Sequence, residues 1–258
     1  MVLLAGVTRF TRRELLGAGL ALAFGCKREP HGLVVFAAVS VEDALREITA
    51  LDRGVELSFA ASSMLAQQLV ATRAADVFLS ADEQWMQWVA DRGLIEPGTR
   101  RDLLSNALVI AARADSSVRV ASPGDLATAE YENLVLADPA SVPAGRYARA
   151  FLESQRIGDG SVWRAVASRI APQLDARATV TTLLADPRRV GIVYASDLVR
   201  EPRLRALYRV PPEAGPRIVY PVAAIAGRPQ IEAARAWIDG LLGPNARAVF
   251  ERFGFRVL

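Results

Sequence analysis

The stretch Leu33-Val34-Val35-Phe36-Ala37-Ala38-Val39-Ser40-Val41-Glu42-Asp43 predicts a β-strand that passes directly into a helix. Its first four residues form a short apolar run typical of a buried strand, and the apolar residues after Ser40 recur at helical spacing. Ser40 is a residue type that caps helices, and Asp43 three positions later completes a capping-box pattern. A helix that starts there directs its free N–H groups at the end of the sheet, where they can hold an anion. For one serine alone, an ordinary cap that binds nothing is the better interpretation.

A second junction of the same kind changes that interpretation. Val55-Glu56-Leu57-Ser58-Phe59 alternates as a strand does, and Ala60-Ala61-Ser62-Ser63 leads into another helical pattern. Two such junctions on neighbouring parallel strands face one crevice beyond the strand ends, where open α/β sheets bind ligands. Ser40 and Ser62 are therefore candidate ligand-binding residues.

The composition excludes several kinds of function. The chain has 258 residues, of which 52% are hydrophobic, and its net charge is only +3 with the arginines scattered. These values are typical of a folded protein and disfavour a nucleic-acid surface. Cys26 is the only cysteine and His31 the only histidine, and His31 lies in an apparent tether. Histidine-dependent nucleophilic catalysis and histidine-based metal sites are thus nearly excluded, whereas catalysis by a pair of carboxylates is not.

Residues 1–26 have the features of an export signal, and residues 27–32 those of a tether. Thr11-Arg12-Arg13-Glu14-Leu15-Leu16 is similar to a twin-arginine motif, and the apolar run after it is too short to span a bilayer. Ala23-Phe24-Gly25-Cys26 resembles a bacterial lipobox, in which Cys26 is the lipidated residue. The alternative is a signal that is cleaved nearby without lipidation. The position of the lone cysteine favours the lipid anchor.

From residue 33 onward, strand patterns alternate with helix patterns in two successive series. This alternation predicts two α/β lobes joined by crossing strands, with residues 33–106 and 217–258 in lobe 1 and residues 107–216 in lobe 2. Residues 94–106 are expected to be a connection, and residues 171–176 to lead into a helix. A cleft between two such lobes is where hinge-closing binding proteins hold their ligands.

Several blocks of the sequence, taken in order, resemble the periplasmic molybdate-binding proteins of bacterial ABC importers. They are Val35–Ser40, Phe59–Ser63, Ala75–Asp82, Asp138-Pro139 with Val142–Gly145, Gly191–Tyr194 and Arg252–Phe255. The resemblance implies a two-lobed α/β fold of the type II periplasmic-binding-protein class, with the ligand in the interlobe cleft. It also implies an exported, monomeric binding protein at the outer face of the cytoplasmic membrane. Such a protein works with an ABC permease and its ATPase, and it has neither a catalytic activity nor a cofactor or resident metal.

The same resemblance implies which residues hold the tetrahedral oxyanion, all of them as neutral donors. Ser40 and Ser62 each offer a hydroxyl and a backbone N–H, Ala144 and Ala176 a backbone N–H, and Tyr194 its phenol. Ala176 stands where the family usually has valine. Independently of the resemblance, the serines and alanines stand where a loop enters a helix, so their N–H groups are free. Tyr194 ends an apolar strand, and a buried phenol needs a hydrogen-bond partner. From the sequence alone, that partner could equally be a ligand or a group of the core.

Four charged residues near these blocks are expected to have structural roles. Arg146 stands where an apolar residue is expected, and the better interpretation is that it faces solvent. Asp76, Asp82 and Asp138 are typical of helix caps and turns.

The sequence thus favours a lipid-tethered protein that delivers molybdate, and tungstate as well, to an ABC importer. Three alternatives stay open. The ligand could be another oxyanion, such as sulfate or thiosulfate. The chain could be an exported hydrolase with paired carboxylates, which would need a carboxylate pair in the cleft. It could also be a sensor or interaction protein without a role in transport. Calorimetry with a panel of oxyanions discriminates best among them.

Overall fold

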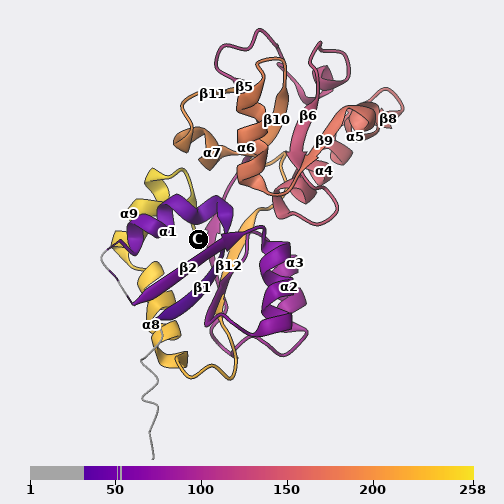
Figure 1. Cartoon of the computed structure of the whole chain (residues 1–258). Helices are drawn as coiled ribbons and strands as arrows, with labels where there is room; N and C mark the ends of the chain where they lie inside the picture. The colour runs from indigo at the N-terminus through magenta and orange to yellow at the C-terminus, as the bar shows by residue number, and fades with distance from the viewer. Residues whose placement is uncertain (1–31, 51, 53) are drawn as a thin grey trace, which may run out of the picture. The chain divides into compact units, whose positions relative to one another are not determined.

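Two large β-sheets organise the part of the chain that the structure describes. This computed structural model describes residues 32–50, 52 and 54–258 (Figure 1). One sheet has the strand order β13-β4-β12-β3-β1-β2, and the other the order β11-β5-β10-β6-β9. We call the first sheet and the helices packed on it lobe 1, and the second sheet with its helices lobe 2.

Lobe 1 is built around β1 (Leu33–Ala38), the strand predicted from the opening apolar run. Val35 and Phe36, on opposite faces of β1, are 0% and 3% exposed, because helices cover both faces of the sheet. β1 pairs in parallel with β2 on one side and β3 on the other, so the carboxyl ends of all three strands lie at one edge. The other strands are β2 (Val55–Ala60), β3 (Val77–Leu79), β4 (Arg101–Ser105), β12 (Val219–Ala224) and β13 (Arg256–Val257). The helices are η1 (Val39–Val41), α1 (Glu42–Ile48), α2 (Ser62–Thr72), α3 (Glu83–Ala90), α8 (Ile231–Leu241) and α9 (Pro244–Arg252).

Lobe 2 repeats the construction around a second buried strand, β10 (Val190–Tyr194). β10 pairs in parallel with β6, and β6 in parallel with β9, so these strands also end at a common edge. The other strands are β5 (Leu108–Arg113), β6 (Leu134–Ala137), β9 (Ile170–Gln173), β11 (Leu204–Arg209) and the short pair β7 (Arg156–Ile157) and β8 (Gly160–Ser161). The helices are η2 (Pro123–Ala127), α4 (Pro143–Ser154), α5 (Val162–Val166), η3 (Ala167–Arg169), α6 (Ala176–Ala185) and α7 (Ala195–Arg200).

The chain passes between the two sheets twice. β4 ends at Ser105 in lobe 1 and β5 begins at Leu108 in lobe 2, while residues 210–218 lead back from β11 to β12. Asn106 lies in the first crossing. Its side-chain amide donates to Ser196 Oγ (2.9 Å), and its Oδ1 accepts the N–H of Ala107 (2.9 Å). These bonds hold the crossing backbone in a fixed conformation at the base of the two lobes.

One expectation about secondary structure was wrong, and several short or edge strands were not predicted. Residues 101–105, expected in a connection, form β4, which pairs with β12 and β13. Residues 171–176 lead into a helix, α6, as expected, but strand β9 at their start was not predicted, nor were β11, β13 and the short pair β7 and β8. Both β9 and β11 are edge strands that remain partly exposed, so neither carries the buried apolar run that identifies a strand in sequence. An edge position also explains how β9 accommodates Pro172.

The expected export signal lies outside the described residues, including Arg12, Arg13 and Cys26. So does most of the tether, of which only Gly32 is described. In the remaining chain, none of the helices combines the length and the apolar character needed to cross a membrane.

Candidate functional site

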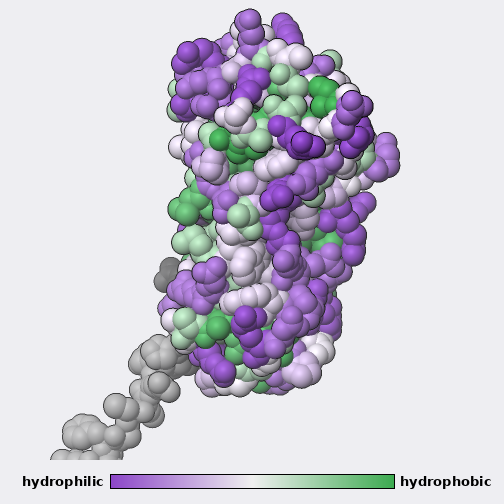
Figure 2. All heavy atoms as spheres, turned by 90° about the vertical axis from the view of Figure 1, so that its right-hand side faces the viewer, coloured by the Kyte–Doolittle hydropathy of each residue, from purple (hydrophilic) through white to green (hydrophobic). Residues whose placement is uncertain are grey.

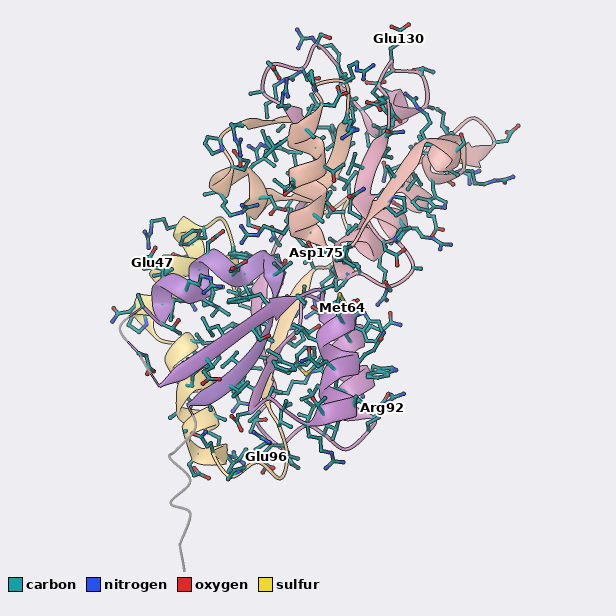
Figure 3. The ribbon with its side chains drawn as sticks, viewed as in Figure 1. Glu47, Met64, Arg92, Glu96, Glu130 and Asp175 are labelled. Carbon is teal, nitrogen blue, oxygen red and sulfur yellow. The ribbon has the colours of Figure 1, made fainter. Side chains whose placement is uncertain are left out.

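The five residues expected to hold a ligand line one small cavity between the lobes. Its lining residues are Ala38, Val39, Ser40, Ala60, Ala61, Ser62 and Ala81 from lobe 1 and Val142, Pro143, Ala144, Ala176 and Tyr194 from lobe 2. Figure 3 labels Met64 near the start of α2 and Asp175 before the start of α6, and both lie at the level where the two lobes meet. The structure therefore brings together all five residues, three of which lie more than 80 positions from the two serines.

Ser40 reaches the cavity from a 3-10 turn rather than from a helix cap. The turn η1 (Val39–Val41) separates β1 from α1, and the residue before the turn, Ala38, makes no side-chain capping bond. The Ser40 hydroxyl instead donates to Tyr220 Oη (3.2 Å). The predicted capping box is thus wrong, because the extra turn moves the start of α1 past Ser40. Asp43, its expected partner, pairs with Arg177 Nη2 at 3.1 Å.

Ser62 is the first residue of α2 and is fully buried. Its Oγ accepts the backbone N–H of Ala81 (2.9 Å), and the structure shows no side-chain cap at this helix start. A hydroxyl that accepts one hydrogen bond still has its own proton to donate. In the described chain, that proton and the free N–H groups at the start of α2 are available to a ligand.

Ala144 and Ala176 stand in the first turns of two helices of lobe 2. α4 begins with Pro143, and its N-terminal flanking residue Val142 provides no side-chain bond. α6 begins at Ala176, where Asp175 accepts the N–H of Ala178 (2.8 Å) and leaves the earlier N–H groups free. Each helix start therefore offers unpaired donors and the positive end of a helix dipole to the cavity.

Tyr194 ends β10 and is 1% exposed. In the part of the chain that the structure describes, no group meets the geometry of a full hydrogen bond to its buried hydroxyl, although the phenol of Tyr220 lies close enough to interact with it. Burial, with the neighbouring phenols of Tyr220 and Tyr147, raises the pKa of Tyr194 well above its ordinary value. The phenol is therefore neutral at physiological pH and remains a hydrogen-bond donor. An unpaired buried hydroxyl is rare in native proteins and indicates a missing partner, such as a ligand.

Sequence reasoning missed the residues that support these groups. Tyr220, on β12, is fully buried and accepts from both Ser40 Oγ and the amide of Asn106 (3.4 Å). It stands within an apolar strand pattern that gives no sign of a polar role. Asn106 had one possible signal, since it is a polar residue between two apolar strands. Asp197 Oδ2 accepts the N–H of Tyr194 (3.0 Å), and burial, opposed by Arg200, raises the Asp197 pKa to about 6.

The charged residues near the cavity differ in part from expectation. Asp82 caps α3, as predicted, by accepting the N–H of Trp85 (2.8 Å), and burial raises its pKa. Asp138 forms the predicted turn by accepting from Ala140 N and Ser141 Oγ. Arg146 does not simply face solvent, because its Nη1 lies 2.9 Å from Asp82 Oδ2.

Asp76 is a structural residue too, although it bonds across the fold instead of capping a helix. It accepts from the backbone N–H of Val34 and pairs with Arg228. These contacts hold β1 and the segment after β12 against the start of β3, on the far side of the sheet from the cavity edge.

The cavity as a whole is a site of neutral donors. Its lining, as far as the structure describes the chain, includes no lysine, arginine, aspartate or glutamate. Nor do the described residues include a cluster of three histidine, cysteine or acidic side chains that could hold a metal ion. Hydroxyls and helix N-termini stabilise negative charge without supplying a counter-ion, so the arrangement suits a small, fully deprotonated anion.

Two α/β lobes that enclose one small cavity are the architecture of hinge-closing solute binders. The profile of the bacterial extracellular solute-binding proteins matches residues 33–256, and the chain belongs to this family. The molybdate-binding protein ModA of Escherichia coli K12 is 34% identical over 256 residues, which cover 94% of this chain and 97% of that protein. ModA of Haemophilus influenzae is 32% identical over 254 residues, or 93% of this chain and 95% of that protein.

A solved structure shows the same fold. The periplasmic molybdate-binding protein of Azotobacter vinelandii superposes with a TM-score of 0.76 at 18% identity, covering 88% of this chain and 99% of that one. The two-lobed type II periplasmic-binding-protein fold predicted from the sequence is thereby confirmed.

Proposed function

We propose that this protein captures molybdate in the interlobe cavity and delivers it to an ABC importer. The observation that carries the proposal is the unpaired, buried hydroxyl of Tyr194 in a cavity of neutral donors. The relatives named for molybdate binding supply the identity of the anion, since they match this chain over nearly its whole length.

The proposed contacts are those that the sequence resemblance implied. Ser62 and Tyr194 donate their hydroxyl protons, and Ala144 and Ala176 donate backbone N–H groups at the starts of α4 and α6, respectively. Ser40 contributes after its hydroxyl rotates away from Tyr220, which costs little because a hydroxyl proton turns freely about its bond. Donors from both lobes converge on one anion, so binding favours the closed arrangement of the lobes.

Neutral donors also rank the possible oxyanions. Molybdate, tungstate and sulfate are fully deprotonated at neutral pH, whereas phosphate keeps a proton that needs an acceptor. A cavity without a carboxylate offers only hydroxyl oxygens for that proton, and each hydroxyl that accepts gives up a donor role. Sulfate has the right charge but is smaller, so donors spaced for molybdate leave some of its hydrogen bonds long. Tungstate is nearly equal in size to molybdate and should bind as well.

Competition calorimetry with molybdate, tungstate, sulfate and phosphate tests this ranking. We expect molybdate and tungstate to bind within a few-fold of one another. Sulfate and phosphate should each be weaker by at least about a hundredfold, equivalent to two poorly made charged hydrogen bonds. If sulfate binds as tightly as molybdate, the molybdate assignment is wrong and the protein is a binder of another oxyanion. If no oxyanion binds, the site assignment is wrong.

The neutral lining favours binding over catalysis. A hydrolase of the carboxylate-pair type needs two acidic groups at the reacting bond. Asp82 and Asp197 lie near the cavity but are engaged as acceptors of backbone N–H groups and do not line it. We therefore assign no catalytic role to the cavity. We also propose that the protein acts as a monomer and that its partners are an ABC permease and the ATPase of that importer.

We further propose that a lipid on Cys26 anchors the mature chain at the outer face of the cytoplasmic membrane. Cys26→Ser should abolish lipidation and move the protein from the membrane fraction to the soluble exported fraction. Cell fractionation measures this, with Arg12→Lys and Arg13→Lys together as a separate variant that should impair export instead. Unchanged membrane association of the Cys26→Ser protein would contradict the lipid anchor.

A further inference from the structure

Arg146 forms an ion pair that joins the two lobes beside the cavity. Its Nη1, on α4 of lobe 2, lies 2.9 Å from Asp82 Oδ2 at the start of α3 in lobe 1. A second bond lies beside it, since Trp85 Nε1 on α3 donates to the carbonyl oxygen of Ser141 (2.8 Å) in the turn before α4. The lobes cannot separate at this point without breaking both interactions.

Both ends of the ion pair are adjacent to residues that line the cavity. Asp82 follows Ala81, whose N–H donates to Ser62 Oγ, and Arg146 stands two positions after Ala144. On its outer side, the pair lines an open groove together with Tyr147. The pair therefore stands between the cavity and this groove.

The two charges differ in their access to water. The side chain of Asp82 is 5% exposed and that of Arg146 is 28% exposed. Asp82 has little contact with water, and its charge contributes to raising the pKa of Tyr194, a lining residue. A buried carboxylate this close to the cavity repels an incoming dianion unless a positive charge balances it.

We propose that Arg146 is the counter-charge that allows the closed cleft to hold a dianion beside Asp82. This inference rests on the proposed function and extends it. The contacts to the anion are neutral, yet the affinity depends on a cation that does not touch it. Arg146 is thus a positioning residue, which neutralises Asp82 and holds the start of α4, with its free N–H groups, against lobe 1.

The other groups around Asp82 cannot replace Arg146. Glu83 adds a second negative charge on the same helix, and its partner Arg217 lies 3.5 Å away with a side chain that is 70% exposed. Tyr147 and Tyr194 face Asp82 as neutral phenols, since burial raises the pKa of both. Ser80 and the N–H of Trp85 supply neutral hydrogen bonds only.

The test compares molybdate affinities, measured by calorimetry, for Arg146→Gln, Asp82→Asn and the double variant. Arg146→Gln should weaken binding by about tenfold, because it leaves an unbalanced buried carboxylate near the dianion. Adding Asp82→Asn to it should restore affinity to within about threefold of the native protein, since asparagine keeps the helix cap without the charge. Arg146→Lys, which keeps the charge, should also stay within about threefold.

Arg149→Gln is the matched control. Arg149 lies on the same helix one turn further on and pairs with Glu153 of that helix, so its loss should leave the affinity unchanged. Thermal unfolding of each ligand-free variant checks folding. Native affinity for Arg146→Gln overturns the inference. A double variant that binds no better than Arg146→Gln also overturns it, because a purely structural contact between the two side chains predicts no rescue. A native protein that binds no molybdate overturns the proposed function itself and is a distinct outcome.

Discussion

Replacing Tyr194 with phenylalanine should weaken molybdate binding while leaving the ligand-free protein equally stable or more stable. The lost phenol removes one hydrogen bond to a charged partner, worth about 1.5–3 kcal/mol, or roughly ten- to a hundredfold in affinity. Among the described residues, no group completes a hydrogen bond to this buried hydroxyl. Removing an unpaired buried hydroxyl relieves a desolvation cost, so the free energy of unfolding should not fall. Calorimetry and urea unfolding measure the two effects.

Tyr131→Phe is the matched control, with the opposite pattern. Tyr131 is also buried, but its hydroxyl donates to the carbonyl oxygen of Leu126 (2.7 Å) and lies away from the cavity lining. Its loss should lower the free energy of unfolding by about 1 kcal/mol and leave molybdate binding unchanged. If Tyr194→Phe destabilises the ligand-free protein and binds normally, the Tyr194 hydroxyl belongs to the core and the ligand site lies elsewhere.

Ser40 and Ser62 could be predicted from the residues alone because their signal is local, whereas the resemblance singled out Ala144, Ala176 and Tyr194. Ser40 and Ser62 follow short apolar strands, and Ala144 and Ala176 stand in first helical turns. Parallel strands bring such junctions to one edge of a sheet. A strand-to-helix pattern within about ten residues therefore indicates that the residue at the junction lies at that edge. What these residues bind was not visible in their spacing, and the molybdate assignment came from the ordered resemblance.

The partners of these residues could not be predicted, because they depend on contacts between distant segments. Arg146 and Asp82 are 64 positions apart, and Ser40 and Tyr220 are 180 positions apart. Ser40 also shows how a local rule fails. Its capping-box pattern satisfies the rule, but the chain inserts a 3-10 turn, and the serine hydroxyl bonds to Tyr220 of a distant strand. The edge strands β9 and β11 were missed because they are only partly buried. A partly buried strand can form without the apolar pattern by which strands are recognised in a sequence.

Gly145→Ala should both destabilise the fold and abolish tight binding. Gly145 lies in the first turn of α4, which packs on the end of β6. A Cβ at this position would lie 2.0 Å from the carbonyl oxygen of Ala137 and 2.5 Å from that of Asp138. Both are backbone atoms, so the start of α4 must move away from β6. Overpacking of this kind costs about 3 kcal/mol or more, because no side chain can rotate to relieve it.

The movement acts on the site directly, because Ala144 is the preceding residue and its N–H group is a proposed contact. Molybdate affinity should therefore fall by more than about a hundredfold, which exceeds the loss of one hydrogen bond to the anion. Gly240→Ala provides the control. Gly240 lies near the end of α8, where an added Cβ meets no atom within 4 Å, and its replacement should be neutral or stabilising by up to about 1 kcal/mol. Urea unfolding and calorimetry on both variants check this contrast. A Gly145→Ala protein with native stability and affinity would show that α4 does not need its close approach to β6 to present its N–H groups to the cavity.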